Sequence, residues 1–170
     1  LIYIVIGTRP DIAEAVSKLA SYSQSPKKVH KKAVHRVIQY LYNTRHYKIV
    51  YTNEENDKNL LHAYSDANLS NGKKHGYSRS GIITFYSGGP ISWKSKLQTV
   101  VCESTRDSEY IAASLCSRDL IYAREFLQDL IGNLSNSKIT LQPSTLYCDN
   151  KPAINTIVRN GYTDKSLSLI

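Results

Sequence analysis

The chain has 170 residues, of which 41% are hydrophobic and 21% are charged, a composition that excludes disordered and collagen-like proteins. It carries a formal net charge of +8, and no apolar run approaches the roughly 20 residues that a transmembrane helix needs. Its three cysteines are widely spaced and form no C-x-x-C pair. A disulfide framework or a zinc site is therefore not expected, and a reducing compartment fits best.

The positive charge is concentrated in two stretches that contain no acid. Residues 27–48 carry seven Lys and Arg residues, and residues 67–102 carry five more. Such blocks suit a polyanion, because neutralised phosphates release condensed counterions. A solvated helix face would explain one cluster, but two clusters with interleaved tyrosines favour contact with nucleic acid. The candidate contact residues are Lys28, Lys31, Lys32, His35, Lys73, Lys74, Lys94 and Lys96.

The first third of the chain predicts two helices. Residues 1–7 have no polar lead-in and suggest a buried strand or core segment. Thr8 is predicted to cap a helix whose apolar stripe extends to residue 20, and a basic second helix follows over residues 27–44. Residues 47–52 suggest a strand, and the polar residues 53–59 suggest a domain boundary.

After residue 60 the pattern changes to strands followed by alternating helix and strand. Strands are predicted over residues 60–66, 82–86, 91–94 and 145–149, with a hairpin turn at residues 87–90. Helices are predicted over residues 105–131 and 151–159. This order predicts an α/β domain with a mixed sheet and helices packed on it.

Three carboxylates occupy positions that suggest a common site. Asp66 and Asp149 each end a predicted strand, and functional groups of open α/β sheets gather beyond the carboxyl ends of the strands. Glu109 heads the apolar stripe of the long helix, so it should face the sheet. The helix dipole also favours a Glu in the first turn, but Asp107 lies off the stripe and can serve that role in a capping box with Ser104.

If these three carboxylates converge, their mutual repulsion requires cations. Two unit charges about 4 Å apart cost about 4 kcal/mol at an effective dielectric constant near 20. Ligation by oxygen alone points to Mg²⁺ or Mn²⁺, and two such ions are the apparatus of phosphodiester hydrolysis. We therefore predict that Asp66, Glu109 and Asp149 are both the catalytic residues and the ligands of two metal ions.

Several short motifs occur in a fixed order along the chain. The second part contains Tyr64-Ser-Asp-Ala, Gly88-Gly-Pro-Ile-Ser-Trp-Lys-Ser-Lys96, Ser104 with Glu109-Tyr-Ile-Ala-Ala-Ser114, and Tyr147-Cys-Asp-Asn150. Together these resemble the ribonuclease H domain of copia-type LTR retrotransposon polyproteins. Upstream, Thr8-Arg-Pro-Asp-Ile12, His30 and residues 36–44 resemble the segment that connects the reverse transcriptase to that domain.

The resemblance implies a connecting segment of two helices over residues 1–53 and an α/β, ribonuclease H-like domain over residues 60–170. It implies two-metal hydrolysis, with Mg²⁺ or Mn²⁺, of the RNA strand of an RNA–DNA hybrid, and it carries the catalytic acids onto Asp66, Glu109 and Asp149. The implied partners are such a hybrid or other nucleic acid and the remainder of the reverse transcriptase polyprotein, with no membrane. The implied location is the cytoplasm, in a virus-like particle, with nuclear access as a further possibility.

The sequence departs from the pattern of that family in three respects. Asn68 and Leu69 stand where the family usually has Asp-Trp, and Asp107 stands where it usually has Glu. The family's last strand, last helix and fourth acid would lie beyond residue 170. The chain also contains no methionine with which translation would begin. We therefore expect the remnant of a decayed element, with weak or absent nuclease activity.

Two other functions stay open at this point. The basic helix over residues 27–44 suits a non-catalytic module that binds nucleic acid, and the chain could also be a structural piece of a larger reverse transcriptase. The position of His30 and His35 on this helix favours contact with solvent or phosphate over catalysis. Trp93 favours packing on the sheet over base stacking.

Overall fold

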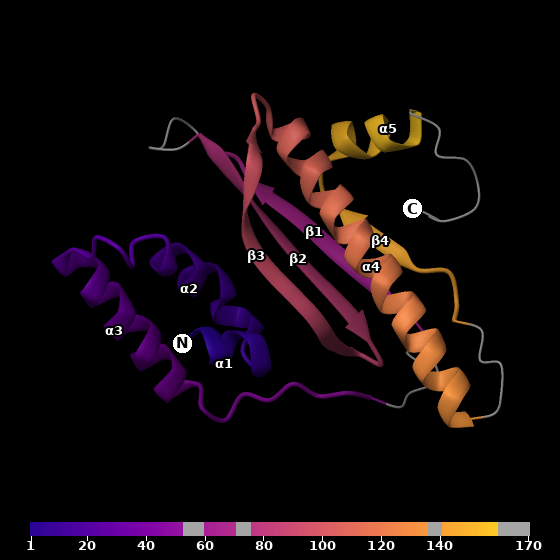
Figure 1. Ribbon diagram of the computed structural model, residues 1–170, viewed down its shortest axis with the longest axis horizontal. Coiled ribbons are helices and arrows are strands. Elements are labelled where there is room, and N and C mark those ends of the chain that lie inside the picture. The colour runs from indigo at the N-terminus through magenta and orange to yellow at the C-terminus, as the bar shows by residue number, and fades with distance from the viewer. Residues whose placement is uncertain (53–59, 71–75, 136–140, 160–170) are drawn as a thin grey trace.

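The computed structural model describes residues 1–52, 60–70, 76–135 and 141–159. Its helices are α1 (Ile2–Gly7), the 3₁₀ helix η1 (Pro10–Ile12), α2 (Ala13–Ala20), α3 (Lys28–Asn43), α4 (Thr105–Ser135) and α5 (Lys151–Arg159). Its strands are β1 (His62–Asn68), β2 (Tyr77–Tyr86), β3 (Gly89–Val101) and β4 (Thr145–Cys148). The long helix α4 crosses one face of the sheet, and α1, α2 and α3 gather beside β3 (Figure 1). No helix in the described ranges is both long and apolar enough to span a membrane.

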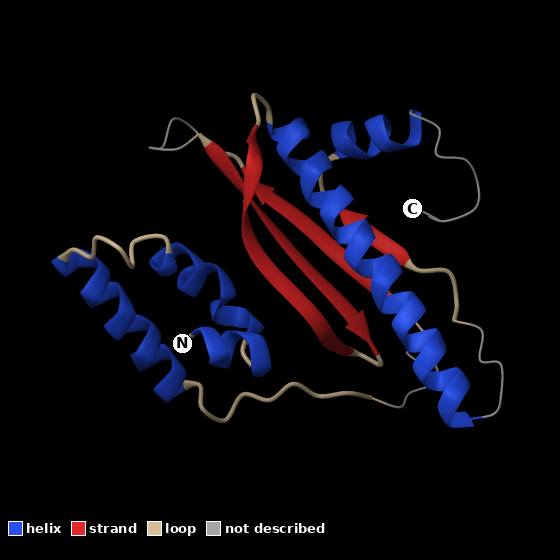
Figure 2. Cartoon of the chain, viewed as in Figure 1, coloured by secondary structure: helices blue, strands red, loops and turns tan. Residues whose placement is uncertain are grey.

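The four strands form one mixed sheet in the order β3-β2-β1-β4 (Figure 2). β2 pairs antiparallel with both β1 and β3, whereas β1 and β4 run parallel. Parallel strands need a crossover connection, which α4 provides. The parallel register ends where Ser65 pairs with Cys148, and Asp66 and Asp149 are the next residues along the chain. Asp149 lies just beyond β4, whereas Asp66, which was predicted to end its strand, is followed by two more residues of β1. The prediction of a mixed α/β sheet with packed helices is confirmed.

The predicted hairpin is present, but its strands are longer than predicted. Ser87 and Gly88 form the turn with φ of 51° and 72°, the left-handed conformation that a tight hairpin turn requires at both central residues. The alternation of apolar residues did not reveal the full strands, because Ser78, Ser80 and Thr84 take inward positions in β2 and are buried.

The core lies between α4 and the sheet. The predicted helical stripe is buried from Ala113 through Leu127, whereas Leu130, which should have extended it, is 43% exposed. Opposite the stripe, the sheet contributes Leu61, Ala63, Ile82 and Leu146. This packing fixes the rotation of α4, and therefore the direction in which the residues of its first turn point.

Three predictions for the first 52 residues are wrong. Residues 1–7 form helix α1 without a buried residue: Tyr3 is 91% exposed, and Val5 is only partly buried against the cluster of Ile12, Val16 and Val37. Thr8 does not cap the next helix; η1 begins at Pro10, with Arg9 at its N-terminal boundary. Residues 47–52 form no strand. They run beside the hairpin turn, where the Thr52 amide donates a hydrogen bond to the Ser87 carbonyl (2.8 Å).

The N-terminal helices are joined to one another by the buried Arg9. Its guanidinium donates hydrogen bonds to both carboxylate oxygens of Asp11, at 2.9 and 2.7 Å, and to Thr44 Oγ1 at 2.6 Å. The Tyr40 hydroxyl donates to Asp11 at 2.9 Å. This network ties η1 to the end of α3, and the hydrogen bond from Arg9 lowers the pKa of Asp11.

The same segment is docked on the sheet through β3. The Trp93 Nε1 donates a hydrogen bond to the Val5 carbonyl (2.7 Å), and the Ser17 hydroxyl donates to the Ser95 carbonyl (2.8 Å). Arg79 on β2 donates to Ser17 Oγ. Trp93 is half-buried in this contact, as expected for a packing residue. Helix α2 therefore borders the face of the sheet that α4 leaves uncovered.

Replacement of Leu120 by Ala should measure how strongly the α4 packing stabilises the fold. Leu120 is 1% exposed, so we expect a loss of about 2–5 kcal/mol in the free energy of unfolding from the lost burial and the cavity. Tyr122→Ala is the matched control, because Tyr122 is on the same helix but 70% exposed, and it should cost less than about 1 kcal/mol. Urea denaturation would measure both, and equal losses would contradict the packing described.

Candidate functional site

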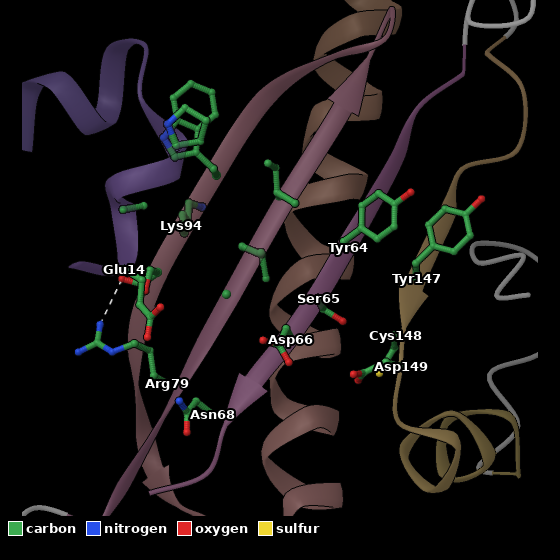
Figure 3. Close-up of a pocket in the computed structure, with 17 residues that line it drawn as sticks. Glu14, Tyr64, Ser65, Asp66, Asn68, Arg79, Lys94, Tyr147, Cys148 and Asp149 are labelled. Carbon is green, nitrogen blue, oxygen red and sulfur yellow. Dashed lines mark hydrogen bonds between the residues drawn. The ribbon is translucent and has the colours of Figure 1, made fainter. Parts of the chain in front are cut away.

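Asp66 and Asp149 lie at the same end of the sheet. Each follows the last paired residue of a neighbouring parallel strand, and both side chains are exposed. Figure 3 shows them among the residues that line one cavity, on the opposite side of the sheet from α4. The position of these two acids, which the sequence predicted from the strand ends, thus follows directly from the parallel pairing.

Glu109 approaches the same place from α4. It is the fifth residue of the helix, heads the buried stripe and is 6% exposed. Burial raises the pKa of Glu109 to about 7, a hydrogen bond from the Ala67 backbone amide opposes this shift, and the negative charges of Asp66 and Asp149 add to it. The buried Oε2 of Glu109 has no hydrogen-bond partner among the described residues. A buried carboxylate beside two other acids is costly unless it is protonated or paired with a cation.

The tightest group of candidate metal ligands is not the three predicted acids. Ligand atoms of Glu109, Cys148 and Asp149 all lie within 4.8 Å of one another. Asp66 is outside this group, although its charge is near enough to raise the pKa of Glu109. Cys148 was missed by sequence reasoning, which considered cysteines only for their spacing from other cysteines and histidines.

The donor set fits a divalent cation. The unpartnered Oε2 of Glu109 is a buried acceptor, and the neighbouring carboxylates of Asp66 and Asp149 add hard oxygen ligands. Oxygen ligands of this kind suit Mg²⁺ or Mn²⁺. A cation at this position would offset both the desolvation of Glu109 and the repulsion among the acids.

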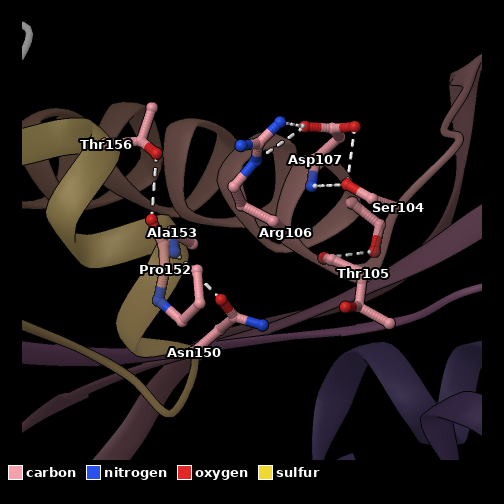
Figure 4. A network of polar contacts seen from close by, with 9 residues as sticks. Ser104, Thr105, Arg106, Asp107, Asn150, Pro152, Ala153 and Thr156 are labelled. Atoms are coloured by element: carbon pink, nitrogen blue, oxygen red, sulfur yellow. Dashed lines mark hydrogen bonds and ion pairs between the residues drawn. The ribbon is translucent and has the colours of Figure 1, made fainter.

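Two helix caps hold the backbone that carries the acids (Figure 4). The Asp107 amide donates a hydrogen bond to Ser104 Oγ (3.1 Å), and the Ser104 hydroxyl donates to the Asp107 carboxylate (2.6 Å), which confirms the predicted pairing. The hydrogen bond from Ser104 lowers the pKa of Asp107. Directly after Asp149, the Asn150 Oδ1 accepts a hydrogen bond from the Ala153 amide (2.9 Å) and begins α5. Glu109 and Asp149 are thus each next to a fixed helix start.

The cavity in front of the acids has a volume of about 650 Å³ and lies between α2 and the uncovered face of the sheet. Tyr64 and Tyr147 form part of its wall; their rings stack with centroids 4.8 Å apart, and both are almost half exposed. Sequence reasoning missed them, although each stands two residues before an acid. Because side chains alternate along a strand, Tyr64 shares a face of β1 with Asp66, and Asp149 follows directly after the end of β4.

Of the predicted nucleic-acid contacts in the described residues, Lys94 alone lines the same cavity as Asp66 and Asp149. Lys28, Lys31, Lys32 and His35 are exposed on α3, which packs on α2 and is separated by it from the sheet (Figure 1). Lys94 and Lys96 are exposed on β3. Lys73 and Lys74 lie outside the described residues.

Two of the basic residues have partners within the protein. The Lys94 ammonium pairs with Asp119 of α4 at 2.6 Å. His30, for which contact with solvent or phosphate was expected, is half-buried and stacks on Tyr22 with ring centroids 4.1 Å apart. Its Nδ1 also accepts a hydrogen bond from the Lys27 amide (3.1 Å), so His30 caps α3. Neither side chain is a free phosphate ligand in this structure.

Several known proteins are similar in sequence to this chain. A retrovirus-related Pol polyprotein from transposon TNT 1-94 of Nicotiana tabacum is 34% identical over 162 residues, which are 95% of this chain and 11% of that protein. A retrovirus-related Pol polyprotein from transposon RE1 of Arabidopsis thaliana is 33% identical over 143 residues, 84% of this chain and 9% of that protein. The chain therefore spans about a tenth of the length of these polyproteins.

A shorter relative matches over most of its own length. The secreted RxLR effector protein 161 of Plasmopara viticola is 34% identical over 122 residues, which are 72% of this chain and 84% of that protein. No protein-family model matches the chain. Among solved structures, an Argonaute of Marinitoga piezophila in complex with guide RNA covers 68% of this chain and 16% of its own, with 11% identity and a TM-score of 0.39, below the level that defines a shared fold.

Glu109→Gln should change the pH dependence of stability. The pKa of Glu109 is near 7 in the folded protein and near 4.5 ordinarily, so between these values the folded protein binds more protons than the unfolded chain. The free energy of unfolding should therefore fall as pH rises from about 4.5 to about 7, by on the order of 1–2 kcal/mol after discounting for solvent screening, and this fall should be absent in Glu109→Gln.

Urea denaturation across this pH range, with a chelator present to exclude metal, would measure the effect. Glu103→Gln is the matched control, because Glu103 is an exposed acid just before the same helix, and this variant should follow the wild type. Parallel pH profiles for the wild type and Glu109→Gln would show that Glu109 is not a desolvated acid.

Proposed function

This chain belongs to the same family as the retrovirus-related Pol polyproteins and the Plasmopara viticola protein that it matches, and it corresponds to a region of a retrotransposon polyprotein; we propose that this region is the ribonuclease H portion. In this proposal it has a ribonuclease H-like fold and hydrolyses the RNA strand of RNA–DNA hybrids with Mg²⁺ or Mn²⁺. Its partners are the hybrid and the rest of the polyprotein, in the cytoplasm within a virus-like particle.

One observation carries the proposal: a buried carboxylate with an unpartnered oxygen lies beside two exposed carboxylates at the point where the parallel pairing of β1 and β4 ends. Glu109 is 6% exposed, and the charges of Asp66 and Asp149 are near enough to raise its pKa. A protein that needed Glu109 only for helix capping would gain nothing from burying it, because Asp107 already serves that role. The arrangement is what a metal-dependent phosphodiesterase requires.

The three acids would have different tasks. Asp66 and Asp149, which are exposed, would hold cations from the side that a phosphodiester can reach. Glu109 would hold them from the protein side, where its carboxylate is buried next to the Ala67 backbone. Metal ions bound there would activate water and stabilise the leaving oxygen. The stacked rings of Tyr64 and Tyr147 offer a surface for a sugar or base next to the acids.

The exposed face of α3 favours a second function, binding of nucleic acid without catalysis. Lys28, Lys31 and Lys32 form no ion pair with a carboxylate in the described part of the chain, so their charges are available to phosphates. Because α3 lies away from the sheet, this surface would hold the nucleic acid at a distance from the acids. It can therefore operate whether or not the acids cleave.

Removal of any one of the three acids should abolish metal-dependent cleavage. We expect slow hydrolysis of the RNA strand of an RNA–DNA hybrid with Mn²⁺, reduced at least about 100-fold in Asp66→Asn, Glu109→Gln and Asp149→Asn. Mn²⁺ should also raise the melting temperature of the wild type, since it binds only the folded site, and this shift should be lost in Glu109→Gln.

The control for both measurements is Glu125→Gln, an exposed acid on the same helix, which should behave as the wild type. Cleavage that persists in all three acid variants, or a Mn²⁺ shift that survives Glu109→Gln, would rule out the proposed site.

Neutralising the face of α3 should weaken the salt dependence of nucleic-acid binding. If Lys28, Lys31 and Lys32 each contact a phosphate, the triple change to Gln should reduce the slope of log K against log salt by about 2–3. Lys18→Gln is the control, because the Lys18 ammonium already pairs with Glu14. Fluorescence anisotropy over a range of salt concentrations would measure the slope, and an unchanged slope would exclude α3 from the interface.

A further inference from the structure

We propose that Glu109, Cys148 and Asp149 form a binding site for a thiophilic divalent cation, Zn²⁺ or Cd²⁺, and that this site overlaps the proposed magnesium site. The binding itself stands on the geometry of these three side chains. Its consequence, competition with Mg²⁺ and inhibition of cleavage, rests on the proposed function.

The three ligand atoms are already close to the spacing that a tetrahedral cation needs. Cys148 Sγ and one carboxylate oxygen each of Glu109 and Asp149 lie within 4.8 Å of one another. Around Zn²⁺, with bonds of about 2.0–2.3 Å, the ligand atoms stand roughly 3.3–3.8 Å apart. Side-chain rotations that move each atom inward by a few tenths of an ångström up to about 1 Å would therefore complete the set, and a fourth position stays open for water.

Glu109 supplies an independent reason for a cation at this place. Its carboxylate is more than nine-tenths buried, and Oε2 has no hydrogen-bond partner among the described residues. Such an atom is expensive to bury, and a cation satisfies it while offsetting the charge of Asp149. The buried acceptor of Glu109 belongs to α4 and the thiol of Cys148 belongs to β4. The two are therefore independent observations, because they are far apart in the sequence and are brought together only by the fold.

The thiol decides which cations the group prefers. Sulfur ligands select Zn²⁺ and Cd²⁺, whereas Mg²⁺ prefers oxygen alone. On binding, the Cys148 thiol loses its proton to solvent and Sγ forms the bond to the cation, with no change of oxidation state. Asp66 lies outside the group, so a bound Zn²⁺ would draw Glu109 and Asp149 towards Cys148 and away from the arrangement of three acids that cleavage requires.

The other two cysteines provide matched controls on the same chain. Cys102 is half-buried, and its Sγ lies 3.1 Å from Gln98 Oε1. Cys116 is buried in the core, with its Sγ directed at the Tyr64 carbonyl (3.6 Å). Neither belongs to the candidate ligand group among the described residues.

Titration of the full chain with Cd²⁺ in an excess of Mg²⁺ tests the site without any need for activity. The wild type should bind one equivalent and develop the ultraviolet charge-transfer band of a thiolate–cadmium bond. Cys148→Ser should lose the band, Glu109→Gln should bind at least about 10-fold more weakly, and Cys102→Ser should behave as the wild type. A band that survives Cys148→Ser, a band lost in Cys102→Ser, or no binding at all would overturn the proposal.

Inhibition is tested separately with Zn²⁺ in the hybrid cleavage assay. The Zn²⁺ concentration that halves the rate should be at least about 10-fold higher for Cys148→Ser than for the wild type, each relative to its own rate without Zn²⁺. Equal inhibition of both proteins would overturn the competition. If the proposed function is wrong, the protein will show the cadmium band but will not cleave the hybrid. If the zinc site is wrong, the protein will cleave the hybrid but will not show the band.

Discussion

The burial of the Glu109 carboxylate is the constraint on which this end of the molecule depends. The stripe that packs α4 on the sheet is apolar from Ala113 through Leu127, and its first position is an acid that is 6% exposed. Helix packing would be stronger with a hydrophobic residue there. The costly burial of Glu109 occurs at the point where β1 and β4 stop pairing, and the two further acids, Asp66 and Asp149, follow this point directly.

The surrounding residues keep the Glu109 carboxylate in its buried position, although this burial is costly. The Ala67 backbone lies near enough to Glu109 to lower its pKa, and the cap formed by Ser104 and Asp107 holds the start of α4, one turn before Glu109. On the other side, Asn150 begins α5 immediately after Asp149, so the second acid has a rigid anchor too. The backbone beside Asp149 and the start of α4 are thus each held by a cap, and the acids stay near enough for Asp66 and Asp149 to raise the pKa of Glu109.

Much of the fold could be predicted because its periodic signals are strong. The apolar stripe of α4 and the Ser87-Gly88 turn could be predicted, because a helical period and a left-handed turn each require characteristic residues at characteristic spacings. The signal failed where burial did not follow hydrophobicity. Ser78, Ser80 and Thr84 are buried in β2 although they are polar, and α1 is exposed although it is apolar.

The three acids of the site could be predicted from the sequence, whereas the cysteine and the tyrosines beside them could not. Asp66 was predicted to end a strand, although β1 continues to Asn68; Asp149 follows the last residue of β4, and Glu109 heads a stripe, so each position could be inferred from its own segment. Cys148, Tyr64 and Tyr147 acquire their surroundings only when β1, β4 and α4 are assembled. Rules based on spacing between ligands on one segment cannot find a set whose members come from a helix and the end of a strand.

The alternation of side chains along β4 explains why a thiol and a carboxylate can share one cation. Within a strand, Cys148 and Asp149 would point to opposite faces, but β4 ends at Cys148 and the chain turns there into α5. The turn brings the carboxylate back within 4.8 Å of the thiol and of Glu109. The cavity wall therefore holds the carboxylates of Asp66 and Asp149, which suit Mg²⁺, together with the thiol of Cys148, which suits Zn²⁺. Both arrangements need Glu109 and Asp149, so selection between the two cations depends on whether Asp66 or Cys148 joins these two acids.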